Sequence, residues 1–183
     1  MKRTLLVLLA LCLPALSACR AKAYRNDVAP QTLALLGAEA AGMEAPVFAG
    51  ADELAEITGQ REELPDIAVC YAADGNSLDE FGVWRAGSDD IKAAASLLRA
   101  YLSSTYENNR AYYDSYIPAE TPKLRDAEVR VYGAYAVYAI LSPESRERFF
   151  SKIETELAPV SPENTRDWQI ARVFFGKLTK YSQ

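Results

Sequence analysis

The apolar and polar positions divide the chain into a leader, a body and a tail. The leader has Lys2 and Arg3 at its start, an apolar run over 4–13 and small residues before Cys19. A membrane-spanning helix needs about 20 apolar residues, so this run is too short to be one. A basic start, an apolar centre and a small-residue end are typical of a secretory signal peptide. We therefore expect residues 1–18 to be removed on export.

Two helices are expected at the start of the body. Asp27 is a candidate N-cap for the first, which should end near Gly42, because glycine commonly stops helices. Its apolar positions include Leu33, Leu36 and Ala40. The second is short and follows Pro46, running from Asp52 to Gly59.

A strand-strand-helix unit is expected next. Residues 67–72 alternate with period two and are followed by the turn sequence Asp74-Gly75-Asn76, so a second strand over 80–86 should pair back on the first. This second strand has Phe81 and Val83 on one face and Trp84 on the other. Ser88, Asp89 and Asp90 are expected to open a long helix, because hydroxyls and carboxylates suit the free amides of a helix start. The apolar positions of that helix are Ile91, Ala95, Leu98 and Leu102.

A second unit of the same kind follows Pro118 and Pro122, which end the long helix. A polar connection through Lys123 and Asp126 leads to strands over 129–132 and 135–141 around a tight turn at Gly133. Ser142-Pro143-Glu144 then begins a helix. The expected apolar side of this helix consists of Phe149, Phe150 and Ile153.

The order of elements predicts an α+β fold. We expect an antiparallel sheet of about four strands, packed on one side by the long helix and the helix after Pro143, with an N-terminal helical segment. The expected organisation is a signal peptide over 1–18, a tether over 19–26, a single domain over 27–158 and an amphipathic segment over 159–183.

The end of the leader resembles the bacterial lipobox. Leu16, Ser17, Ala18 and Cys19 match it position by position. The resemblance implies that the Cys19 thiol receives diacylglycerol before cleavage, so that lipid on Cys19 holds the chain to the extracytoplasmic face of the cell membrane. The alternative is an ordinary signal peptide cut at an Ala-x-Ala type site, which would leave Cys19 as a plain thiol.

Charge and composition exclude several classes of function. Losing Lys2 and Arg3 with the leader leaves 18 basic and 25 acidic side chains, which makes nucleic acid an unexpected partner. The chain has no histidine, so Ser-His-Asp and Cys-His catalysis and imidazole metal sites are excluded. No glycine-rich phosphate loop is present. We therefore name no catalytic residue, no metal ligand and no cofactor.

The carboxylate pairs Asp79–Glu80 and Asp89–Asp90 are the remaining candidates for catalysis. Glycosidase chemistry needs only two acids at a defined separation. Adjacent acids at a strand or helix start are, however, more often solvated edges and caps, and we favour that interpretation.

Cys70 and a group of tyrosines are further candidates. Cys70 lies among alanines in a strand, which favours a small buried hydrophobic residue over a nucleophile. Five tyrosines invite a role in sugar stacking or peptide docking, although the rim of the core is the favoured interpretation. They are Tyr101, Tyr106, Tyr112, Tyr113 and Tyr116.

The tail combines helical spacing of apolar residues with basic residues between them. The apolar positions are Trp168, Ala171, Phe175 and Leu178, with Val173 and Phe174 alongside; the basic ones are Arg166, Arg172, Lys177 and Lys180. An amphipathic helix of this kind could contact the anionic membrane face or a partner protein, or cover the domain's own sheet, which we slightly favour.

The chain resembles the uncharacterised lipoprotein family of Gram-positive bacteria known as domain of unknown function 4358. The resemblance covers about 27–157 and depends on the lipobox, the acidic helix around 52–57, the hairpin containing Glu80, and the segment 116–124. The family's long helix often has an arginine where this chain has Thr105, and its members often end near Leu157, so the tail departs from the pattern. The family has no established activity, and the resemblance therefore implies a role for Cys19 alone.

Two functions from different classes remain. The first is a membrane-anchored, non-catalytic binding or accessory module of the cell envelope, with an envelope protein as a partner. The second is a carboxylate-dependent enzyme acting on envelope polymers. Two separate carboxyls with raised pKa values in one concavity would favour the enzyme.

Overall fold

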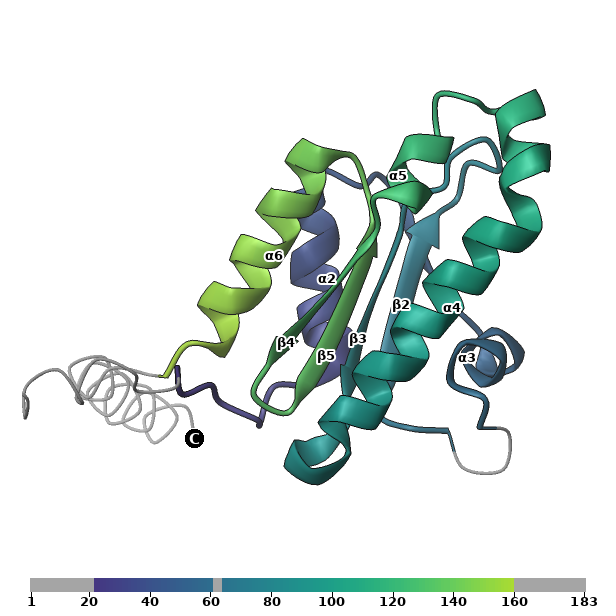
Figure 1. The fold of residues 1–183 in the computed structure, drawn as a ribbon. Helices are drawn as coiled ribbons and strands as arrows, with labels where there is room; N and C mark the ends of the chain where they lie inside the picture. Colours follow the sequence, from purple (N-terminus) through teal and green to yellow (C-terminus); the bar gives the residue numbers. More distant parts are fainter. Residues whose placement is uncertain (1–21, 61–63, 160–183) are drawn as a thin grey trace, which may run out of the picture.

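The computed structural model describes residues 22–60 and 64–159. This part of the chain has the predicted α+β fold (Figure 1). Its elements, in chain order, are α2 (Pro30–Ala41), β1 (Pro46–Phe48), α3 (Ala51–Thr58), β2 (Ile67–Ala72), β3 (Glu80–Arg85), α4 (Gly87–Tyr116), α5 (Thr121–Arg125), β4 (Glu128–Tyr132), β5 (Tyr135–Ile140) and α6 (Pro143–Leu157). The two predicted strand-strand-helix units are therefore β2-β3-α4 and β4-β5-α6.

The strands form one antiparallel sheet in the order β1-β2-β3-β5-β4. It has five strands, where about four were predicted. The additional strand, β1, pairs with the end of β2, with Pro46 opposite Ala72 and Phe48 opposite Cys70. A strand of three residues is too short to show an alternating pattern, which is why the sequence did not reveal it.

Helices cover both faces of the sheet, with α2 and α6 on one side and α4 on the other (Figure 1). The expectation that α4 and α6 share a side is therefore wrong. The physical reason is that the central strands are apolar on both faces: all six residues of β5 are buried. Phe81 and Val83 pack under α2 and α6, and Trp84 packs under α4, so the predicted division of β3 between two faces is confirmed.

Helix α2 packs closely on α6. An added Cβ on Gly37 would lie 2.5 Å from Cε2 of Phe149, so only glycine allows this approach of the two helices. The helix ends at Gly42, which has the left-handed φ of 74° that suits glycine, as predicted. Its predicted cap is wrong, because α2 begins at Pro30 after Ala29, and Asp27 instead forms an ion pair with Arg25.

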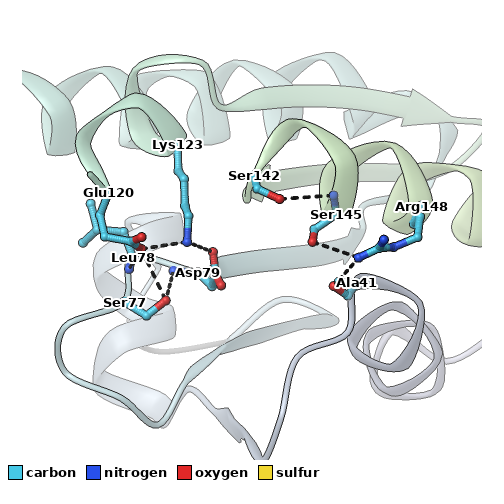
Figure 2. Close-up of polar contacts among 9 residues, drawn as sticks. All are labelled: Ala41, Ser77, Leu78, Asp79, Glu120, Lys123, Ser142, Ser145 and Arg148. Atoms are coloured by element: carbon cyan, nitrogen blue, oxygen red, sulfur yellow. Dashed lines mark hydrogen bonds and ion pairs between the residues drawn. The ribbon is translucent and has the colours of Figure 1, made fainter. Parts of the chain in front are cut away.

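For the other helices, one predicted cap is confirmed and one is wrong. Ser142 caps α6, its Oγ accepting a hydrogen bond from the Ser145 amide at 3.3 Å (Figure 2), as predicted. Helix α4 begins one residue before Ser88, and its N-cap is Ala86, so the predicted cap at Ser88 is wrong. The segment around Lys123, expected to be a polar connection between elements, contains the short helix α5.

Residues 22–28 lie against the end of the domain formed by α6 and the β4–β5 turn. The Arg25 amide donates to the Leu157 carbonyl at 2.9 Å, and Lys22 forms an ion pair with Glu154. The Tyr24 ring meets the Tyr132 ring edge-on at 5.5 Å between centroids. The segment expected as a tether is thus in contact with the domain from Lys22 onward.

None of the helices in the described ranges is both long enough and apolar enough to cross a membrane. The leader, Cys19, and the tail from residue 160 lie outside the described residues.

Candidate functional site

A cavity of about 370 Å³ lies at the end of the sheet where β2 connects to β3. Residues from this connection form one wall, and side chains of α3, α4, α5 and β5 form the others. The chain segment 22–28 packs at the opposite end of the sheet, beside Leu157 and Gly133 (Figure 1). The cavity therefore lies at the end of the sheet opposite to the one at which the described chain begins.

Glu80, the first residue of β3, is one of the acidic residues that line this cavity. Its Oε1 accepts hydrogen bonds from Tyr138 at 2.5 Å and from Tyr101 at 3.0 Å. Burial raises the pKa of the Glu80 carboxyl above its ordinary value, and the nearby negative charge of Glu53 raises it further, although the two tyrosine hydrogen bonds oppose this shift. The carboxyl is thus held in place while its charged form is disfavoured.

The two tyrosines reach Glu80 from different elements. Tyr138 lies on β5, directly opposite Gly82 of β3, and Tyr101 lies on α4. An added Cβ on Gly82 would lie 2.3 Å from Cε1 of Tyr138, so the bare backbone of Gly82 makes room for the ring. Burial raises the pKa values of both phenols, and the Glu80 charge raises them further, so both remain protonated donors.

An ion-pair network fixes the rim of the cavity (Figure 2). Lys123 of α5 donates to Asp79 and to Glu120, each at 2.7 Å. Glu120 also accepts from the Leu78 amide at 2.9 Å and, more weakly, from the Ser77 hydroxyl at 3.4 Å. These contacts tie the β2–β3 connection to α5.

The same network shifts the pKa values of its members. Burial alone would raise the pKa of Glu120, but the hydrogen bonds from Lys123 and Leu78 hold it below its ordinary value. Burial alone would lower the pKa of Lys123, but Asp79 and Glu120 keep it above its ordinary value. Glu120 and Lys123 therefore remain charged at neutral pH, and their network with Asp79 carries a structural role.

The two acidic pairs that the sequence suggested lie in different parts of the structure. Asp79 and Glu80 both line the cavity, but Asp79 is bound by Lys123 and Glu80 by tyrosines. Asp79 and Glu80 are therefore held by different partners. Asp89 and Asp90 lie in the first turn of α4, where the sequence predicted a helix start. This is the end of α4 away from Tyr113, which lines the cavity.

The sequence did not reveal Glu53, Tyr101 and Tyr138 as partners of Glu80. Glu53 was expected only as part of an acidic helix, and its carboxylate accepts the Gly50 amide at 2.6 Å at the start of α3. Tyr138 is 58 positions from Glu80, and only the register of β3 with β5 brings the two together.

Cys70 is fully buried, and burial raises the pKa of its thiol to about 11. The interpretation of this residue as a small buried hydrophobic side chain is confirmed.

The tyrosines of α4 have different environments. Tyr101, Tyr106 and Tyr113 pack against the core beneath α4, as expected for its rim. Tyr112 and Tyr116 are 59% and 72% exposed, and their rings lie 4.7 Å apart between centroids. The exposed pair keeps the docking interpretation open for two of the five residues.

Among residues 22–60 and 64–159, no three carboxylates or cysteines are grouped so that they could hold a metal ion. The lipobox residues Leu16, Ser17, Ala18 and Cys19 and the apolar residues of the tail lie outside those ranges. Comparisons of the chain with protein-family models, with curated proteins and with solved structures found no match.

Proposed function

We propose that the mature chain is a lipoprotein, anchored through Cys19 to the extracytoplasmic face of a cell membrane, whose domain is a non-catalytic binding or accessory module of the envelope. The observation that carries the anchor is the sequence Leu16-Ser17-Ala18-Cys19 directly after a basic and apolar leader. The proposed resemblance to domain of unknown function 4358 agrees with this role.

The arrangement of the domain supports the proposal. Lys22 is three residues from Cys19, and an extended residue spans about 3.5 Å, so the packed segment begins within about 10 Å of the lipid. The end of the domain formed by Leu157 and Gly133 would then face the bilayer. The cavity at the opposite end would open toward the envelope, where a soluble ligand or a protein could reach it.

The start of the tail supports a second contact with the membrane. Ala158 and Pro159 line a small hollow of about 240 Å³ together with Lys22 and Ala23, so the tail leaves the domain beside the tether. Its four basic residues would therefore begin close to an anionic surface. Since helices already cover both faces of the sheet, we favour the membrane over the domain's own sheet as the surface that the tail contacts.

Mass analysis of the protein from the membrane fraction tests the anchor. We expect a mature chain that begins at Cys19 and carries diacylglycerol, and we expect Cys19→Ala to abolish the lipid. Cys70→Ala is the matched control and should leave the lipid in place. Recovery of the wild-type chain free in the medium, with an unmodified Cys19, would contradict the proposal.

Crosslinking in intact cells tests the role as a module. Reproducible capture of one envelope protein by the lipidated wild-type chain would support an accessory function. Its binding surface could then be assigned by repeating the capture with Glu80→Gln and with Tyr112→Ala combined with Tyr116→Ala.

One observation favours the alternative of a carboxylate-dependent enzyme on envelope polymers. The raised pKa of Glu80 is the property of a general acid, and Glu53 lies close enough to contribute to it. The tyrosines that hold Glu80 and the capping bond of Glu53, however, give both carboxylates structural partners. Release of soluble fragments from cell-wall material by the wild type, and none by Glu80→Gln, would establish the enzyme instead.

A further inference from the structure

The Glu80 carboxylate presents one oxygen for a ligand. Both tyrosine hydrogen bonds are made to Oε1, at 2.5 Å and 3.0 Å. Oε2 has no hydrogen-bond partner among the described residues, and the side chain lines the cavity. A cavity-lining carboxylate that is fixed through one oxygen, and whose other oxygen has no partner, is pre-organised to accept a donor from a ligand.

The charges around the cavity are negative and largely unmatched. Glu53, Asp74, Asp79 and Glu80 line it, and its described lining contains no lysine or arginine. Lys123, the cation at the rim, is already bound to Asp79 and Glu120. In the described part of the chain, no ion pair is formed by Glu53, Asp74 or Glu80. A ligand could therefore supply the positive charge that these carboxylates lack.

The walls and the size of the cavity fit a small organic molecule. Its volume of about 370 Å³ is within the usual range of small-molecule sites, about 300–1,000 Å³. Tyr71, Tyr113 and Ile140 provide aromatic and aliphatic surface around the carboxylates. Tyrosine rings attract organic cations as well as packing against alkyl groups. A cation with a short apolar body would thus meet complementary surfaces at both of its ends.

We propose that this cavity binds a small organic cation, with a primary ammonium or guanidinium group donating to Oε2 of Glu80 and an alkyl or aromatic body between Tyr71 and Tyr113. This inference rests on the proposed role of the domain as a binding module and adds the chemical class of its ligand. The cation would replace the water that burial removes from the Glu80 carboxylate, so the free-energy penalty of the ionised side chain would be relieved in the complex.

Calorimetric titration of the lipidated full-length mature chain in detergent tests the inference. The probes are 1,5-diaminopentane and butylguanidinium, with 1,5-pentanediol and butanol as neutral probes of matched length. We expect saturable binding of the cations and none of the neutral compounds. We expect Glu80→Gln, which keeps an oxygen for the two tyrosines, to weaken cation binding at least about tenfold, as for loss of a hydrogen bond to a charged group. Glu39→Gln removes an exposed charge on α2, on the other face of the sheet, and should bind like the wild type.

Three outcomes would overturn the inference. They are no saturable binding of either cation at millimolar concentration, equal binding of the neutral compounds, and undiminished binding by Glu80→Gln. Melting temperatures of the two variants no lower than that of the wild type in the absence of probe would show that a loss of binding is not a loss of folding. If the amines fail to bind while crosslinking captures an envelope protein, the inference fails and the proposed function stands. If neither ligand nor partner is found, both fail.

Discussion

Tyr138 donates a 2.5 Å hydrogen bond to Glu80 across two neighbouring strands, in the space that Gly82 leaves open. This contact lies on the same face of the sheet as α4, from which Tyr101 donates to the same oxygen. Two phenols cannot neutralise a carboxylate, so ionisation of Glu80 is unfavourable at this buried place. Carboxyls whose pKa is shifted by burial cluster at functional sites, which makes Glu80 a candidate for binding or chemistry.

Replacing Glu80 by glutamine should stabilise the protein at neutral pH. The pKa of Glu80 is raised in the folded state above its ordinary value of 4.5, so between 4.5 and the folded pKa the folded protein binds the additional proton. The wild type therefore loses stability as the pH rises through this interval, by about 1.4 kcal/mol for each pH unit that the interval spans. Below 4.5 the carboxyl is protonated in both states and the two proteins should differ least.

Urea denaturation of the wild type and Glu80→Gln from pH 4 to pH 8 measures this difference. The free energy of unfolding of the variant minus that of the wild type should grow as the pH rises. Taking the difference removes the contributions of Glu120 and Glu154, whose lowered pKa values act in the opposite direction in both proteins. A difference that shrinks with rising pH would show that Glu80 is stabilised as an anion.

Gly82→Ala should destabilise the domain and disturb the Glu80 site. The new Cβ would meet the Tyr138 ring at 2.3 Å and Val69 at 3.0 Å, both within the core beneath α4. Overpacking of this kind costs about 1–3 kcal/mol. Gly75→Ala is the matched control, because nothing lies within 4 Å of its added Cβ. Equal melting temperatures for the two variants would mean that the ring moves aside without strain.

The sequence predicted those features of the fold that depend on patterns within a few neighbouring residues. Period-two alternation placed Phe81 and Val83 opposite Trp84, and Ser142-Pro143 placed the start of α6, since both patterns lie within a few residues. Which face of the sheet α6 covers depends on the path of the chain after β5, and no short pattern records it. Apolar residues on both faces of 67–72 were a usable signal for a sheet covered on both sides.

The site was less predictable than the fold. Glu80 was a candidate only beside Asp79, because adjacency is visible in a sequence, whereas strand register is not. Its partners come from α4 and β5, at separations of 21 and 58 residues. The desolvation that makes Glu80 unusual arises from that packing and could not be inferred from its neighbours in the chain.

Lys123→Met should loosen the rim of the cavity. The change keeps the aliphatic stem but leaves Asp79 and Glu120, which are partly buried, facing each other without a cation. Loss of charged hydrogen bonds at partly buried groups costs about 1–3 kcal/mol. Because Lys123 lowers the pKa of Glu120, the wild type gains stability from this pair above the unfolded pKa and loses it as the pH falls.

Denaturation at pH 7 and at pH 3 tests this prediction. The variant should be less stable than the wild type at pH 7, and the gap should narrow at pH 3. Arg125→Met is the control, because Arg125 pairs with its exposed neighbour Asp126 and surface pairs of this kind contribute little. A larger loss for Arg125→Met than for Lys123→Met would contradict the structural role of the network.

Counting reactive thiols tests the burial of Cys70 and the state of Cys19 together. After the leader and Cys12 are removed, the mature chain has Cys19 and Cys70 as its cysteines. Cys70 is fully buried, and burial raises its pKa to about 11, so at pH 8 it should not react with an aromatic disulfide reagent. If Cys19 carries lipid, the native chain should release no chromophore at first and the unfolded chain one equivalent.

The alternative outcomes separate two failures. An unmodified Cys19 would give one fast equivalent in the native chain and two in the unfolded chain, which would contradict the lipid anchor but not the fold. The variant Cys70→Ala would then retain the fast equivalent. If Cys70→Ala abolishes a fast reaction of the native chain, the thiol of Cys70 is accessible. Ser103→Cys, at an exposed position of α4, is the positive control and should react at once.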